Sequence, residues 1–139
     1  MTCSLDSLEV IRVDQYGEEA ASVTLSSGRA VITVFGWPCH LQVGELVHNA
    51  LSGDGSLVAA CLEDWPADLK AERSLERLDA WVGEGSSAWS WRGCGRLVDP
   101  DRGIVDVLGF KIECDGVDLP SGTAVEFECE RVSLDVFDS

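Results

Sequence analysis

Most of the chain shows the short alternation of apolar and polar residues that is typical of β-strands. The clearest case is VEFECE, residues 125–130. Because successive side chains on a strand point to opposite faces, this segment predicts one buried apolar face and one acidic outer face. The residues expected to face inward are Val125, Phe127 and Cys129. The residues expected to form the acidic face are Glu126, Glu128 and Glu130.

The alternation changes phase at two points in the chain. The apolar face shifts by one residue between Val10 and Ile11, and it shifts again near Arg131. An extra residue in one strand produces such a shift and bends the strand, so both positions predict β-bulges in a curved sheet. The continuous apolar run AVITVF, residues 30–35, instead predicts a central strand that is buried on both faces.

One segment in the middle of the chain has the period of a helix. Apolar residues follow one another at helical spacing, at Ala71, Leu75, Leu78 and Val82. This spacing places them on one face of a helix. The sequence therefore predicts one α-helix near residues 65–82, with Asp64 as its N-cap and Gly83 at its end.

The chain of 139 residues has the length of one domain. We expect residues 1–139 to form a single compact, mainly β domain, with a β-meander over 5–62, the helix over 65–82 and a second β-meander over 94–137. The two halves share a faint repeat, RAVITVFGW and RGIVDVLGF. Two architectures remain open, a small curved β-barrel or two similar β-meanders.

The second half resembles the cold-shock and other oligonucleotide-binding barrels. GRLVDPDRGIVDV followed by LPSGTAVEFECE has their order of strand, charged turn, strand and Gly-x-x-Val strand entry. The resemblance covers about forty residues and implies an oligonucleotide-binding-type barrel. Where those domains stack bases on aromatic side chains, this chain has Ile104, Val105, Asp106 and Val107. The resemblance therefore implies the barrel without its nucleic-acid site.

The charge balance narrows the class of partner. The chain has 25 acidic and 10 basic residues and a net charge of −15. Such a charge repels polyanions and attracts basic surfaces, so a nucleic-acid partner is not expected and a basic protein partner is. The chain has no apolar run long enough for a membrane span and no export signal at its start. We expect a cytoplasmic protein whose six cysteines are reduced.

Aromatic and basic residues mark the candidate binding site. Trp89 and Trp91 alternate on one side of a strand, beside Arg92 and Arg96. Trp37 is a further candidate at the corner after the first apolar run. Large aromatic residues beside arginines are common anchors of protein interfaces, although they also pack helices onto barrels.

The sequence offers two candidate catalytic centres, and it supports them less than it supports the binding site. Cys39 and His40 contain the elements of an activated thiolate, but neighbours on a strand point to opposite faces. Adding His48 does not give the spacing of a metal site, so no metal or cofactor is expected. Asp106 would be a buried acid if it faced inward, but a bulge at Gly109 would place Val105 and Val107 inside and Asp106 in water.

These observations favour a non-enzymatic acidic binding module that neutralises a basic protein, as immunity and inhibitor proteins do. Two alternatives remain open from the sequence. One is a small barrel that binds a small molecule or an oligonucleotide, and the other is a small enzyme that uses a Cys39 thiolate or Asp106.

Overall fold

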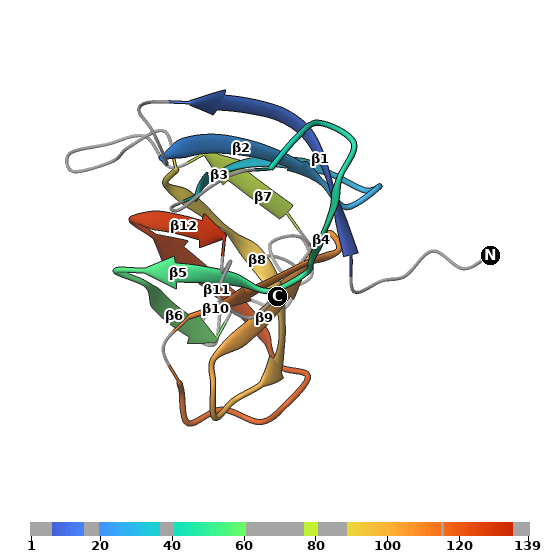
Figure 1. Ribbon diagram of the computed structural model, residues 1–139. Coiled ribbons are helices and arrows are strands. Elements are labelled where there is room, and N and C mark those ends of the chain that lie inside the picture. The colour runs from blue at the N-terminus through green and yellow to red at the C-terminus, as the bar shows by residue number, and fades with distance from the viewer. Residues whose placement is uncertain are drawn as a thin grey trace.

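The computed structural model describes residues 7–15, 20–36, 41–60, 77–80, 89–114 and 116–134. This part of the chain is mainly β, as the sequence predicts, and its 12 strands join in one sheet (Figure 1). The first six strands are β1 (Ser7–Gln15), β2 (Ala21–Ser26), β3 (Val31–Gly36), β4 (Leu46–His48), β5 (Leu51–Asp54) and β6 (Leu57–Ala60). The others are β7 (Arg77–Ala80), β8 (Trp91–Asp99), β9 (Ile104–Val107), β10 (Phe110–Glu113), β11 (Ala124–Cys129) and β12 (Arg131–Leu134).

The predicted helix is wrong over residues 77–80, which form strand β7 and pair antiparallel with β8. The rest of the predicted range 65–82 lies outside the described residues. Gly93 of β8 explains why a strand can lie here, because a Cβ atom at that position would collide with the carbonyl oxygen of Arg77. The sheet therefore offers Arg77–Ala80 a close backbone partner, and this pairing outweighs the helical spacing of a few apolar residues.

Strands β1, β2 and β3 form an antiparallel meander. The register of β1 against β2 shifts between Val10 and Arg12, so the predicted bulge is confirmed. Strand β3 is central, between β2 and β12, but it is not buried on both faces. Ile32 and Val34 are buried, whereas Val31 is 51% exposed. The apolar run therefore alternates in burial like any strand with one face on the core.

The two halves of the chain are interleaved in the sheet. Strands β8, β9 and β10 form a second antiparallel meander. Between the two meanders lie β12 and β5, in the order β3, β12, β5, β10. The pairing of β5 with β10 is parallel, and its pairing with β12 is antiparallel. A strand from the first half thus lies between two strands from the second.

Strands β5 and β6 follow β12 and β11 along one antiparallel ladder with a constant register. Asp54 is opposite Arg131 in β5 and β12, and Leu57 is opposite Glu128 in β6 and β11. The pairing continues across the break between the strands, since the backbone N–H of Glu130 donates to the carbonyl oxygen of Asp54 across a distance of 3.0 Å. The phase shift near Arg131 is present, but the predicted β-bulge is wrong, because the constant register leaves no extra residue in either strand. A bend at Glu130 separates β11 from β12 instead.

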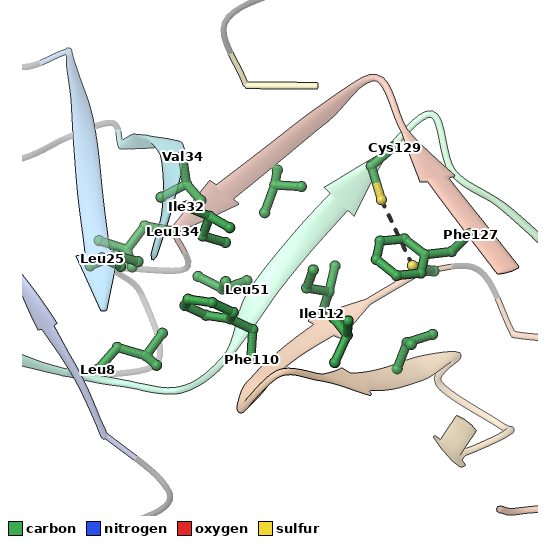
Figure 2. Packing of buried hydrophobic residues seen from close by; sticks show 14 of the residues in the cluster. Leu8, Leu25, Ile32, Val34, Leu51, Phe110, Ile112, Phe127, Cys129 and Leu134 are labelled. Carbon is green, nitrogen blue, oxygen red and sulfur yellow. Dashed lines mark hydrogen bonds between the residues drawn. The ribbon is translucent and has the colours of Figure 1, made fainter. Parts of the chain in front are cut away.

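The core lies between the β1–β3 meander and the strands around β5 and β10 (Figure 2). Its largest side chains are those of Phe110 and Phe127. The Sγ atoms of Cys114, next to β10, and Cys129, in β11, are 3.9 Å apart. Because β10 and β11 are separated by β9 and β8 in the strand order, this contact requires the sheet to curl strongly. Within the described residues, no ladder joins the two end strands, β4 and β6.

Candidate functional site

Charged side chains collect on one face of β6, β11, β8 and β7. Directly opposite positions in neighbouring strands carry side chains on the same face. One row across the four strands consists of Leu57, Glu128, Arg92 and Asp79. The row beside it contains Glu126, Cys94 and Arg77. We call Leu57, Arg77, Asp79, Arg92, Glu126 and Glu128 the charged face.

Two hollows lie along β11 on the charged face. One hollow, of about 230 Å³, has Arg77, Asp79 and Arg92 on its β7 and β8 side, and β11 forms its other side. The other, of about 380 Å³, has Leu57 and Val58 on its β6 side. Glu126 and Glu128 line both hollows. The two carboxylates that the sequence places on the outer face of β11 therefore stand at the centre of the site.

The charges on this face are not used within the described part of the chain. The three ion pairs between described residues all lie outside the charged face. They join Arg12 to Asp14, Arg102 to Glu113, and Arg131 to Asp54. The Nε atom of Arg77 is buried and has no hydrogen-bond partner among the described residues. An approaching group of opposite charge would gain these contacts without breaking an existing pair, which lowers the cost of binding.

The two predicted tryptophans use their indole N–H groups inside the protein. Trp89 donates from Nε1 to the hydroxyl of Ser22 over 2.7 Å, and its ring meets Phe35 edge to face at a centroid distance of 4.9 Å. Trp91 donates from Nε1 to the carbonyl oxygen of Thr33 over 2.8 Å. Both side chains are half-buried. These contacts tie the start of β8 to β2 and β3, whereas Arg92 points to the charged face.

Replacing Trp91 with phenylalanine should lower the free energy of unfolding by about 1.5 kcal/mol, because the half-buried carbonyl oxygen of Thr33 loses its indole donor. Urea denaturation measures this change. Arg92→Gln is the matched control at the next position, and we expect it to change stability by less than about 0.5 kcal/mol because Arg92 is exposed. An unchanged urea midpoint for Trp91→Phe would contradict the structural role of the indole.

Arg96 and Asp106 lie in a separate row with Lys111. Asp106 is opposite Arg96 on one side and opposite Lys111 on the other. Val105 and Val107 are fully buried and Asp106 is half-buried, so the register with the valines inside is confirmed. Arg96 is exposed and donates to the carbonyl oxygen of Gly122 over 3.3 Å. Neither Arg96 nor Asp106 lines the two hollows of the charged face.

Several predicted residues lie away from the charged face. Trp37, Cys39 and His40 lie outside the described residues. His48 is exposed at the end of β4. Glu130 is at the bend after β11, where its carbonyl oxygen accepts a hydrogen bond from the hydroxyl of Ser90. The described ranges contain no group of three or more histidine, cysteine or acidic residues that could hold a metal ion.

Sequence reasoning missed Arg77 and Asp79, because the helical spacing of Leu75, Leu78 and Val82 assigned this segment to a helix. The available signal was the two-residue alternation of Arg77 and Asp79 with Leu78 and Ala80, which is the pattern of a strand. An alternation over four residues is weak evidence for a strand when helical spacing extends over the twelve residues from Ala71 to Val82. The antiparallel pairing with β8 makes this segment a strand.

The charged face combines side chains that can pair with groups of either charge and an apolar side chain that can make a hydrophobic contact. It combines three carboxylates, two guanidinium groups and one exposed leucine around two shallow hollows. In the ranges that the structure describes, no helix is both long and apolar enough to cross a bilayer. Comparison of the chain with protein-family models, with curated proteins and with solved structures gives no match.

Proposed function

We propose that the chain is a non-enzymatic, acidic, cytoplasmic binding module that recognises a basic protein through the charged face, as an immunity or inhibitor protein does. The observation that carries this proposal is the set of Asp79, Glu126 and Glu128 around the two hollows. None of these carboxylates forms an ion pair with another described residue. They are therefore available to lysine or arginine side chains of a partner.

The net charge of −15 supports the same proposal at longer range. A strongly negative field accelerates the encounter with a basic surface and slows it with an acidic one. Arg77 and Arg92 add selectivity, because a uniformly basic surface would meet two like charges in the hollow of about 230 Å³. The preferred partner places carboxylates opposite these arginines and basic groups opposite the glutamates.

Leu57 supports a protein as the partner. Its side chain is 71% exposed beside Glu128, on the last strand of the sheet order among the described residues. Protein interfaces combine an apolar contact of this kind with a polar rim, whereas small-molecule sites enclose most of the ligand and both of these hollows are open to solvent. The tryptophans Trp89 and Trp91 support the site from beneath by fixing the start of β8.

We also propose that part of the sheet closes into a small barrel of the oligonucleotide-binding type. If β5 with β6 and β11 with β12 are each taken as one bent strand, the pairings run through β10, β9 and β8 back to β11. Five strands then form a ring, the number found in those barrels. The constant register along the bent ladder supports this closure. The charged face would lie on the outer wall of the ring.

Reversing the two central charges should abolish fast association. We expect Glu126→Lys with Glu128→Lys to lower the association rate constant for the partner at least about tenfold in low salt, because the carboxylates steer and contact basic groups. A pull-down from the native lysate at low salt with a salt gradient identifies the partner. Surface plasmon resonance with the purified partner then measures the rate constants.

The matched control is Glu9→Lys with Asp118→Lys, which changes the net charge equally at exposed positions away from the charged face. We expect less than a threefold change in the association rate constant for this control, because it alters the overall field alone. Equal losses for both double variants would leave only non-specific attraction. An association rate constant that does not depend on salt would also contradict the proposal.

A further inference from the structure

Two buried thiols face each other in the core between β10 and β11. Cys114 directly follows β10, and Cys129 ends β11. Their Sγ atoms are 3.9 Å apart, as the dashed line in Figure 2 marks. A disulfide needs a distance of about 2.05 Å, so a shift of roughly 2 Å, within the range of a side-chain rotation, brings the sulfurs to bonding distance.

Gly53 of β5 provides the space that both sulfur atoms occupy. A Cβ atom at this position would lie 2.6 Å from the Sγ of Cys129 and 3.5 Å from the Sγ of Cys114. It would also lie 3.3 Å from Cγ2 of Ile112. The absence of a side chain at Gly53 therefore leaves room for the Sγ of Cys129, since real Cβ atoms do not approach sulfur as closely as 2.6 Å, and the Sγ of Cys114 lies at an ordinary contact distance from the same point.

The two thiols differ in their access to solvent. Cys114 is 7% exposed, whereas Cys129 is completely buried. A small oxidant that enters from solvent therefore reaches Cys114 first, because the reaction of a thiol depends on its access as well as on its ionisation. Cys129 is then the neighbour that can react with the oxidised sulfur.

We propose that Cys114 and Cys129 form an oxidation site that closes to a disulfide when the protein meets a peroxide. The Cys114 thiolate attacks one oxygen of hydrogen peroxide, the O–O bond breaks, and the sulfenic acid and hydroxide form. The sulfur of Cys129 then attacks the sulfenic sulfur, the S–O bond breaks and the S–S bond forms. The two thiol protons leave with the two oxygens as water. Each cysteine loses one electron, and the peroxide gains two.

The disulfide would connect the end of β10 to the end of β11 across the curl of the sheet. The two residues are 15 positions apart. Closing a loop of this length restricts the unfolded chain, so the oxidised protein is the more stable form. The cross-link also fixes β11, the strand that carries Glu126 and Glu128. This inference rests on the positions of the sulfurs and does not depend on the proposed function.

The test treats the purified native protein with hydrogen peroxide, blocks the remaining thiols with iodoacetamide in denaturant and maps the peptides by mass spectrometry. We expect a peptide pair joined through Cys114 and Cys129, with the loss of two hydrogen atoms. The midpoint of thermal unfolding should rise by roughly 5–10 °C and return to its original value with dithiothreitol.

Variants at single cysteines complete the test. Cys114→Ser and Cys129→Ser should each abolish the cross-link and the thermal shift. Cys94→Ser is the matched control, since Cys94 is as completely buried as Cys129, and it should retain both the cross-link and the thermal shift. If a serine variant does not fold, the peptide map of the unaltered protein still decides. Recovery of both peptides as alkylated thiols, or a disulfide between Cys114 or Cys129 and any other cysteine, would overturn the proposal.

Discussion

Gly95→Ala will lower the free energy of unfolding by about 3 kcal/mol, the upper end of the usual cost of overpacking a core. A Cβ atom at this position would lie 2.6 Å from the carbonyl oxygen of Asp106 and 2.9 Å from side-chain atoms of Val105 and Val107. One of these neighbours is backbone and the other two are fully buried β-branched residues, so none can move aside cheaply. Urea or thermal denaturation measures the loss.

The position of Gly95 in the sheet explains why the effect is large. On one edge of β8, Trp91–Cys94 pair with β7 and Arg96–Asp99 pair with β9. Gly95 lies where the partner changes, and the backbone of β9 approaches it there. A side chain at this point would push β9 away from β8 and disturb the second meander. Strands depend on such glycines where another backbone comes close.

Gly28→Ala provides the matched control for Gly95→Ala. Gly28 lies in the turn between β2 and β3, has a φ of +87° and has no atom within 4 Å of an added Cβ. Its substitution therefore adds only backbone strain, about 1 kcal/mol. If the two variants lost the same stability, steric contact with β9 would not be the cause of the loss at Gly95.

Asn49→Ala should also cost about 3 kcal/mol of stability. Asn49 is 4% exposed, and its side-chain amide bridges the β9–β10 hairpin. Its Nδ2 donates to the carbonyl oxygen of Gly109 over 2.7 Å, and its Oδ1 accepts from the backbone N–H of Lys111 over 3.0 Å. Removing the amide leaves two half-buried backbone groups without this partner, which adds a desolvation cost to the loss of the two hydrogen bonds.

The hairpin depends on Asn49 because its turn is strained. Leu108 has a φ of +49°, in the left-handed region that costs a branched side chain about 1–2 kcal/mol. The carbonyl oxygen of Leu108 accepts a hydrogen bond of 2.6 Å from the hydroxyl of Ser27. Together, Ser27 and Asn49 hold the turn against the first meander. Without Asn49 the turn can move away from the first meander. Hydrogen exchange of the Lys111 backbone amide should then become faster.

Gln42→Ala removes an amide from an exposed position and serves as the control for Asn49→Ala. We expect its free energy of unfolding to stay within about 0.5 kcal/mol of the original value. Thermal denaturation of the two variants gives the comparison. Equal stability of Asn49→Ala and the unaltered protein would mean that water replaces the buried amide without cost, and the bridging role would then be wrong.

Local alternation predicted a large part of this fold. The inward and outward faces of residues 125–130 and the bulge in β1 agree with the structure because each depends on the period of one strand. The change of phase near Arg131 is also real, although it comes from a bend and not from the predicted bulge. The same period correctly places Val105 and Val107 inside. Mainly β architecture follows from the sum of such segments.

Features that depend on distant pairing were not predictable from local pattern. Nothing in residues 77–80 alone reveals that β8 has an open edge beside Gly93, so the spacing of Leu75 and Leu78 predicts a helix where the structure has a strand. For the same reason, the charged face was only partly predicted. Arg92, Glu126 and Glu128 were identified from their own strands, whereas Arg77 and Asp79 join them only through the pairing of β7.

The ladder formed by β5 and β6 with β11 and β12 governs when this protein can fold. Within the described residues, β5 and β6 pair only with strands from residues 110–134. A nascent chain on the ribosome therefore carries Leu51–Asp54 and Leu57–Ala60 without these partners until residues 110–134 have been translated. Contacts so distant in sequence slow folding and expose strand edges meanwhile. This ladder can therefore form only after residues 110–134 have been synthesised.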